Sequence, residues 1–441
     1  MVFPDRAPHG AARRRLARSS NAARRGAPWR LVLVLLCGAV GSTLARAERI
    51  ITLDDAIALA EEMNPGVSAN LGREEAARAG IVTARQFPNP SVEGNAGPQR
   101  PRGGSGTPSG TAWGVGIAQP IEYPSVRESR RRTAEANLGS VEAGSAAFRA
   151  QLFAQVHSNF YEVLQRQEQL GIAEEDLKLL GEIRDRVGLR AKLGESPRLD
   201  LVRTETEVLN AQRARDSAAV RVTQAKLALA NLIGIAPDEA YAVRGSLGSA
   251  TLPALERLRE QVTRDNPQIQ QALAEQERAR NRLQLERDLR LPAPTLQAGY
   301  LQEPDKEVTR LGLTLPIPLF NRREGQIAEA LAEAKVADAQ LRARELALTR
   351  ELDAAYGRFV VARQQVETFE GGLLERAQRT LEAAEAAYRF GERGILEYLD
   401  AQRTFRAVRQ DYLNARYELA YSVIEIERLA GRDYLTSGIS R

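Results

Sequence analysis

The stretch Tyr388-Arg-Phe-Gly-Glu-Arg-Gly-Ile-Leu-Glu-Tyr-Leu-Asp-Ala401 joins two very long segments of helical pattern. Gly391 and Gly394 favour a break in the helix, and an apolar pattern restarts at Ile395. A related stretch, Leu193-Gly-Glu-Ser-Pro-Arg-Leu-Asp200, occurs in the first half of the chain. The sequence therefore predicts two long helical hairpins that end in similar tips, as in a tube of coiled coils with a constriction at its end.

The two tips belong to a repeat that runs through the chain. Matched positions include Asn64-Pro65 with Asn266-Pro267, Gly194-Glu195 with Gly391-Glu392, and Leu232-Ile-Gly234 with Leu429-Ala-Gly431. The offset between matched positions changes little, so chance is a poor explanation. The sequence predicts a first structural repeat over residues 48–245, a second over 246–433 and a C-terminal tail over 434–441.

Each repeat has the same predicted order of elements. The predicted short helices cover about 53–63 and 253–264, the second helices about 65–86 and 267–290, and the β-hairpins about 91–120 and 294–317. The loop of the second hairpin is placed at 302–307. Leu311, Leu313 and Leu315 alternate with small or polar residues, which indicates a strand with one apolar face. An ordinary half-buried hairpin has the same local pattern and stays open as an alternative.

Two proline-free arms follow the hairpins. From about Ser125 to Leu193, and from about Asn321 to Phe390, apolar residues recur at heptad-like spacing, which predicts one continuous helix in each arm. The returning helices, about 197–233 and 395–430, are shorter than the arms. The second helix of each repeat is therefore expected to complete the coiled coil.

The formal charge of +5 comes from the first residues of the chain. Residues 1–47 hold nine of the Arg and have the features of a signal peptide: an Arg-rich start, the apolar run Leu31–Val40 and small residues at Ala45 and Ala47. The apolar run is too short for a membrane anchor. The rest of the chain has slightly more acidic than basic residues, which gives no sign of nucleic-acid binding.

The residues after 47 lack the groups that most catalytic and metal sites need. The one Cys is Cys37, and His157 is the one His beyond the predicted signal peptide. No Cys/His metal cluster, cofactor motif or phosphate-binding loop is present in the sequence, so we predict that the protein is not an enzyme. No later segment is apolar enough for a transmembrane helix, so a membrane-spanning part would have to be a closed β-barrel.

The tandem repeat, the paired hairpins and both tips resemble the TolC family of outer-membrane efflux factors. The junction Leu313–Ile327 and the segment Tyr398–Phe405 are similar to its heavy-metal (cobalt–zinc–cadmium, CzcC-like) branch. The resemblance implies a mainly α fold with a small β part. It implies a homotrimer with a 12-stranded transmembrane β-barrel, four strands per chain, that continues as a long α-helical coiled-coil tunnel. Such a protein lies in the outer membrane and extends into the periplasm.

The resemblance also implies roles for residues at the tips. Tyr388 and Arg393 would form a gate latch with Asp200, and Glu397 and Asp400 would form a pore constriction that favours cations. Ordinary carboxylates at a helix N-terminus are the alternative for Glu397 and Asp400. A periplasmic adaptor is expected to dock on the tips, at Leu193, Gly194, Glu195, Ser196, Pro197, Phe390, Gly391, Glu392 and Gly394.

The resemblance implies a passive exit duct for heavy-metal cations such as cobalt, zinc, cadmium or nickel. Its expected partners are an adaptor (membrane fusion) protein, a proton-driven inner-membrane pump of the RND type and outer-membrane lipid. One alternative is the same duct serving drug efflux or type I protein secretion. Another is a periplasmic coiled-coil scaffold without a pore.

Overall fold

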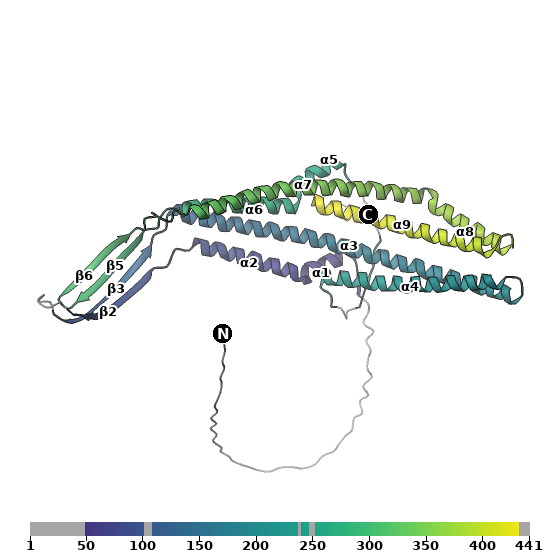
Figure 1. Ribbon diagram of the computed structural model, residues 1–441, viewed down its shortest axis with the longest axis horizontal. Helices are drawn as coiled ribbons and strands as arrows, with labels where there is room; N and C mark the ends of the chain where they lie inside the picture. The colour runs from purple at the N-terminus through teal and green to yellow at the C-terminus, as the bar shows by residue number, and fades with distance from the viewer. Residues whose placement is uncertain (1–48, 101–107, 237–239, 247–251, 432–441) are drawn as a thin grey trace, which may run out of the picture. The chain divides into compact units, whose positions relative to one another are not determined.

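The computed structural model of the chain describes residues 49–100, 108–236, 240–246 and 252–431. The predicted signal peptide (1–47) and C-terminal tail (434–441) lie outside the described residues. The first half contains β1 (Arg49–Ile51), α1 (Leu53–Met63), α2 (Pro65–Arg85), β2 (Ser91–Gln99), β3 (Gly110–Pro120), α3 (Pro124–Lys192), α4 (Arg198–Ile233) and β4 (Tyr241–Val243) (Figure 1).

The second half repeats this order. It contains α5 (Leu255–Asp265), α6 (Pro267–Asp288), β5 (Thr295–Glu303), β6 (Lys306–Thr314), α7 (Glu324–Thr368), a π-helical turn (Phe369–Leu373), α8 (Leu374–Arg389) and α9 (Ile395–Ala430). In Figure 1 the four long strands lie side by side, and the α3–α4 and α8–α9 turns lie at the same end of the helices.

Two matched asparagines show why the repeat folds in the same way twice. Asn64 and Asn266 cap α2 and α6, and each side-chain oxygen accepts a hydrogen bond of 2.8 Å from the backbone N–H two residues on. The amide of Asn64 also donates to the Leu232 carbonyl at 2.9 Å, and that of Asn266 to the Leu429 carbonyl at 2.7 Å. Each asparagine thus joins the start of one helix to the end of the returning helix.

A short parallel pair of strands was not predicted from the sequence. β1 pairs with β4, and Ile51 lies opposite Val243. Both residues are buried, and both strands have only three residues. Strands this short show no pattern of alternating apolar and polar residues. Their pairing joins the start of the first repeat to its end. The pattern of one strand alone could not have revealed the pair.

The long strands form one antiparallel sheet in the order β2-β3-β5-β6. β3 pairs with β5, so the two predicted hairpins become a single sheet, with Gly116 opposite Gly299. The loop predicted at 302–307 is wrong in length: the β5–β6 ladder continues to the pair Glu303 and Lys306, whose side chains form an ion pair at 3.2 Å. Only two residues remain in the turn, and this ion pair supports the last rung of the ladder.

The two faces of the sheet differ in chemistry. Val92, Leu311 and Leu313 leave 77%, 86% and 66% of their surface exposed on one face. Trp113 and Tyr300 lie on the same face, with ring centroids 5.8 Å apart. Because successive residues of a strand point to opposite faces, the other face carries mostly glycine and polar residues. The predicted alternation of apolar with small or polar residues is therefore present in the sheet.

The helices pack side by side in the order α2, α3, α6, α7, because α6 contacts both α3 and α7. As predicted, α2 packs on α3 and α6 on α7. Small residues of α7 (Ala330, Ala334, Ala337) are buried and allow a close approach. The main core lies where α1, α3, α4, α5, α7 and α9 meet, and its largest fully buried side chains include Phe160, Tyr161, Leu229, Leu348 and Leu352.

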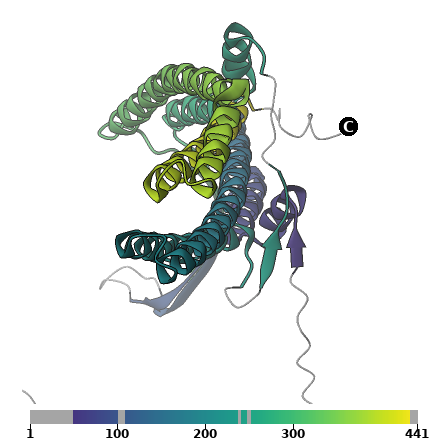
Figure 2. The same ribbon diagram turned by 90° about the vertical axis from the view of Figure 1, so that its right-hand side faces the viewer.

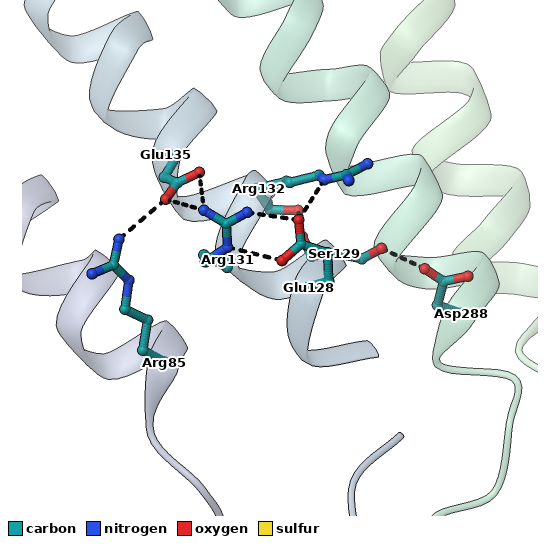
Figure 3. A network of polar contacts seen from close by, with 8 residues as sticks. Arg85, Glu128, Ser129, Arg131, Arg132, Glu135 and Asp288 are labelled. Carbon is teal, nitrogen blue, oxygen red and sulfur yellow. Dashed lines mark hydrogen bonds and ion pairs between the residues drawn. The ribbon is translucent and has the colours of Figure 1, made fainter. Parts of the chain in front are cut away.

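A polar network joins three of these helices near the sheet (Figure 3). Arg131 of α3 pairs with Glu128 at 2.6 Å and with Glu135 at 2.8 Å, and Glu135 also pairs with Arg85 of α2 at 3.3 Å. Hydrogen bonds from Arg131 and the neighbouring Arg132 lower the pKa of Glu128 to about 2. The labelled side chains are those of Arg85, Glu128, Ser129, Arg131, Arg132, Glu135 and Asp288. The Ser129 hydroxyl donates to Asp288 and thereby ties α3 to α6.

The second arm is not the single helix that the sequence predicts. α7 ends at Thr368, a π-helical turn spans Phe369–Leu373, and α8 continues to the tip. Gly372 in this turn has φ 124°, a value that side chains disfavour. The pair Gly371-Gly372 is the signal in the sequence that indicates this break, because glycine tolerates the backbone conformation of the turn. The apolar periodicity of the arm did not reveal it.

We expect Gly372→Ala to destabilise the helical arm by about 1–3 kcal/mol, because alanine is strained at this positive φ. Gly371→Ala is the matched control, since a Cβ there meets no atom within 4 Å and its φ is not positive. That control should equal or exceed the wild type in stability, since alanine favours helix. Thermal unfolding followed by circular dichroism measures both variants, and an equal loss in both would contradict a special conformation at Gly372.

Candidate functional site

Both helical tips have the predicted turn. Gly194 and Gly391 follow the ends of α3 and α8 with φ of 79° and 75°. In each tip the backbone N–H of the next residue donates to a carbonyl in the last helical turn at 2.9 Å. The left-handed glycine and this bond are the usual way to end a helix. The next helices begin at Arg198 and Ile395, as the sequence predicts within a few residues.

Arg190 of α3 links the two tips. Its guanidinium carbon lies 5.1 Å from the centre of the Tyr388 ring, and it donates to the backbone carbonyls of Tyr388 and Arg389 at 3.5 and 3.4 Å. One turn earlier, Arg186 pairs with Glu385 of α8 at 3.3 Å. Figure 2 shows the α3–α4 hairpin in teal beside the α8–α9 hairpin in yellow-green. The two tips of one chain are thus held together by cations of α3.

Tyr388 is the buried member of the predicted latch. The residue is 9% exposed, and its ring stacks on Tyr398 with ring centroids 5.9 Å apart. Burial raises the pKa of Tyr398 to about 12. The hydroxyl of Tyr388 is buried and has no hydrogen-bond partner in the described part of the chain. A buried hydroxyl without a partner carries a desolvation cost. This hydroxyl can still form a hydrogen bond with a group from outside the chain.

The other latch residues do not meet Tyr388 within one chain. Asp200 lies in the first turn of α4, accepts from the Ser196 hydroxyl at 3.3 Å and lies 3.8 Å from Arg203. The Arg393 side chain is exposed and forms no hydrogen bond or ion pair with the residues that the structure describes, whereas its backbone N–H donates to the Ala387 carbonyl at 3.3 Å. No hydrogen bond or ion pair joins Asp200, Tyr388 and Arg393 to one another. The predicted latch contacts are therefore not formed within one chain.

Glu397 and Asp400 lie on the solvent side of α9. Both are exposed, whereas Tyr398 and Leu399 between them are buried in the tip core. Residues three apart on a helix are neighbours on one face, so the two carboxylates form a single acidic patch. Among the described residues, neither carboxylate forms an ion pair. The patch keeps its charge available to other molecules.

A row of arginines on α9 was missed by the sequence interpretation. The ion pairs are Arg403 with Glu207, Arg406 with Asp176 at 2.8 Å, Arg409 with Glu175 at 2.7 Å and Arg416 with Glu168 at 3.6 Å. Together they hold α9 against α3 and α4. The spacing of three and seven residues between these arginines is the signal in the sequence that indicates one charged helix face.

Asp176 is the most buried of the carboxylates that pair with this row of arginines. Its side chain is 6% exposed, and it accepts hydrogen bonds from Arg406 and from the buried amide of Gln402. Burial raises the pKa of Asp176 above its usual range, and the Arg406 guanidinium acts in the opposite direction. Removing one partner of such a buried pair is costly because it leaves a polar group unsatisfied. The contact therefore positions the α8–α9 hairpin on α3.

The described part of the chain offers no cluster of three or more His, Cys, Asp or Glu side chains that could hold a metal ion. None of its helices carries an apolar stretch long enough to cross a membrane. The buried His157 lies on α3 within the protein. The features that stand out are instead the tips, the arginine row and the two-faced sheet.

Comparisons with known proteins identify what this arrangement is. The chain is 27% identical over 385 residues to the cobalt-zinc-cadmium resistance protein CzcC of Cupriavidus metallidurans, covering 87% of this chain and 90% of that protein. It is 23% identical to the outer membrane protein TolC of Vibrio cholerae, covering 91% and 95%. These similarities support the family and the branch predicted from the sequence.

Solved structures share the fold. The crystal structure of CusC, described in work on folding and transmembrane channel formation, matches with a TM-score of 0.74 and 19% identity over 86% of this chain and 92% of that chain. The outer membrane protein VceC of Vibrio cholerae matches with a TM-score of 0.73 and 17% identity over 87% and 96%. The family of outer membrane efflux proteins matches residues 56–235 and 258–432, one segment in each half. The chain therefore belongs to the outer membrane efflux protein family, a family of outer-membrane channels.

Proposed function

We propose that the protein is the passive exit duct of a tripartite, proton-driven RND-type efflux system for heavy-metal cations such as cobalt, zinc, cadmium or nickel. The observation that carries this proposal is the similarity to CzcC along 87% of the chain. In this proposal an inner-membrane pump and a periplasmic adaptor deliver the cations. The duct carries them across the outer membrane without chemistry of its own.

The sheet supports a closed homotrimer. β2 and β6 are its edges, and their outer hydrogen-bonding groups lack a strand partner in one chain. Pairing β6 of one copy with β2 of the next removes these edges, and three copies give twelve strands. The exposed apolar face, with Val92 and Leu311, then contacts outer-membrane lipid. The two predicted repeats, 48–245 and 246–433, would each contribute a hairpin to this wall.

The tips have the chemistry of a docking surface for the adaptor. Leu193 and Phe390 occupy corresponding turns and leave 65% and 79% of their surface exposed. Exposed apolar side chains that lie together can mark a site where another protein binds, and these two lie on tips that are held side by side. We infer that these residues and the neighbouring turn residues contact the adaptor, one tip from each repeat.

The latch is proposed to close between copies of the chain. Arg393 has no ion pair in the described chain, and the Tyr388 hydroxyl has no partner. We infer that Arg393 of one copy pairs with Asp200 of a neighbouring copy when the tips converge. Ion pairs of this exposed kind are weak enough to break when an adaptor docks. Glu397 and Asp400 would form the cation-favouring constriction beside them.

Deletion of the gene is expected to lower tolerance to at least one of cobalt, zinc, cadmium and nickel, because the cations would lose their exit route. Growth across metal concentrations, with and without a plasmid copy, measures this effect. Dyes and antibiotics are tested in parallel, since the same duct could serve drug efflux. Unchanged metal tolerance together with lost dye tolerance would contradict the metal assignment and favour the drug alternative. A secretion defect alone would favour type I secretion.

A further inference from the structure

Two opposite charges share one cross-strand row of the sheet. Glu93 lies opposite Gly116, Gly116 opposite Gly299, and Gly299 opposite Arg310. Directly opposed residues of an antiparallel ladder point to the same face. Glu93 on edge strand β2 and Arg310 on edge strand β6 therefore project from one face of the sheet, with two glycines between them.

This face is the one opposite the apolar face. The neighbours of the charged residues along the strands, Val92 and Leu311, point the other way and are 77% and 86% exposed. In an outer-membrane channel an exposed apolar sheet face contacts lipid, so the charged face contacts the water of the pore.

The space between the two charges is open. A Cβ at Gly116 would come no closer than 3.6 Å to another atom, and one at Gly299 no closer than 3.4 Å, which are ordinary contacts with strand carbonyls. Packing within the chain therefore does not require glycine at either position. A hollow of about 520 Å³ on the sheet includes Glu93, Gln297 and Arg310 in its lining.

Neither charge is neutralised by a neighbour. Glu93 and Arg310 are exposed, and neither forms an ion pair with another residue that the structure describes. The remaining charged residues of the four strands, Glu303, Lys306 and Glu307, lie beside the β5–β6 turn, and Glu303 pairs with Lys306. Away from this turn, the polar face of the four described strands thus carries one unpaired anion and one unpaired cation.

We propose that Glu93 and Arg310 set the charge selectivity of the membrane-spanning part of the duct, separately from the acidic patch at the tips. The proposal rests on the trimeric duct described above. Three strand spacings put the two residues about 14 Å apart, and a strand tilt of about 40° separates their levels by about 9 Å along the pore. Three copies then form a carboxylate ring and a guanidinium ring. The separation is close to the Debye length of about 10 Å at 0.1 M salt, so the rings act largely independently.

Cysteine labelling tests the face that each residue occupies. In a Cys37→Ser background, Glu93→Cys and Arg310→Cys should react with a charged, membrane-impermeant thiol reagent applied to outer membranes. Val92→Cys and Leu311→Cys are the matched controls, since each is adjacent in sequence and points to the apolar face. We expect labelling of the first pair only. Labelling of the second pair only, or equal labelling of all four, would overturn the proposal.

Reversal potentials in planar bilayers under a KCl gradient test the selectivity itself, using the purified full-length channel. Arg310→Gln should raise the cation-to-anion permeability ratio, and Glu93→Gln should lower it. Each change is expected to be about fivefold at 0.1 M salt and about twentyfold at 0.01 M, because three unit charges about 10 Å from the pore axis act on the cation and on the anion with opposite sign. Gln297→Ala, on the same face and uncharged, should leave the ratio unchanged.

The outcomes separate this proposal from the proposed function. If deletion of the gene lowers metal tolerance but neither single variant shifts the permeability ratio, the charge rings alone are overturned. If the permeability ratio shifts with the expected signs but deletion of the gene leaves metal tolerance unchanged, the rings are supported and the metal assignment is overturned. The double variant Glu93→Gln, Arg310→Gln should return the ratio close to the wild-type value, because the two rings act with opposite sign.

Discussion

Neutralising the acidic patch at the tips, with Glu397→Gln and Asp400→Asn together, should reduce the cation-to-anion permeability ratio of the channel by about tenfold. Both carboxylates are exposed and unpaired among the described residues. Threefold symmetry would place six of them around the narrowest part of the duct, where charge concentrates counter-ions most strongly. Reversal potentials in planar bilayers measure the ratio.

Asp185→Asn is the control for this double variant, because Asp185 is an exposed carboxylate of α3 that already pairs with the adjacent Arg184. It should leave the ratio unchanged. If the double variant lowers thermal stability and leaves the ratio at the wild-type value, Glu397 and Asp400 act only on the helix dipole of α9. That result would remove the constriction from the proposed function.

Breaking the proposed latch, with Arg393→Ser or Asp200→Ala, should raise the open probability and the mean conductance in planar bilayers. An exposed ion pair contributes about 0.2–1 kcal/mol, so three latches in a trimer change the open-to-closed ratio by at most about 150-fold. Tyr388→Phe removes one hydroxyl and keeps the ring stacked on Tyr398. A rise in conductance in this variant would show that the hydroxyl takes part in the latch.

Arg389→Ser is the matched control for the latch. Arg389 lies at the end of α8, and its guanidinium makes no ion pair with the described residues, although its carbonyl accepts from Arg190. Removal of its charge should leave conductance unchanged. An equal rise in Arg389→Ser and Arg393→Ser would show that net charge at the tip, and not a specific ion pair, controls opening. No change in any of the latch variants would exclude Asp200, Tyr388 and Arg393 as the gate.

The contact between Arg190 and Tyr388 differs from the predicted gate. The sequence interpretation assigned Tyr388 to a bond with an acidic residue, yet in the structure a cation of α3 covers its ring. Arg190 and Tyr388 are 198 residues apart, and nothing in the local pattern of either helix indicates the contact. The α8–α9 tip is thus fastened to α3 of the same chain, which leaves Asp200 and Arg393 available for contacts between chains.

Local chemistry determined the parts of this protein that the sequence predicted well. The tips and the strands depend on residues only a few positions apart, so left-handed glycines and alternation can be read directly from the chain. Tertiary structure alone decided the pairing of β3 with β5, the burial of Asp176 and the contact of Arg190 with Tyr388. Each joins segments far apart in the chain, where packing and not local propensity chooses the partner. The break at Gly372 lies between the two cases: the Gly-Gly pair permits it, and the packing of Phe369 and Glu370 against Tyr412 of α9 holds the turn in place.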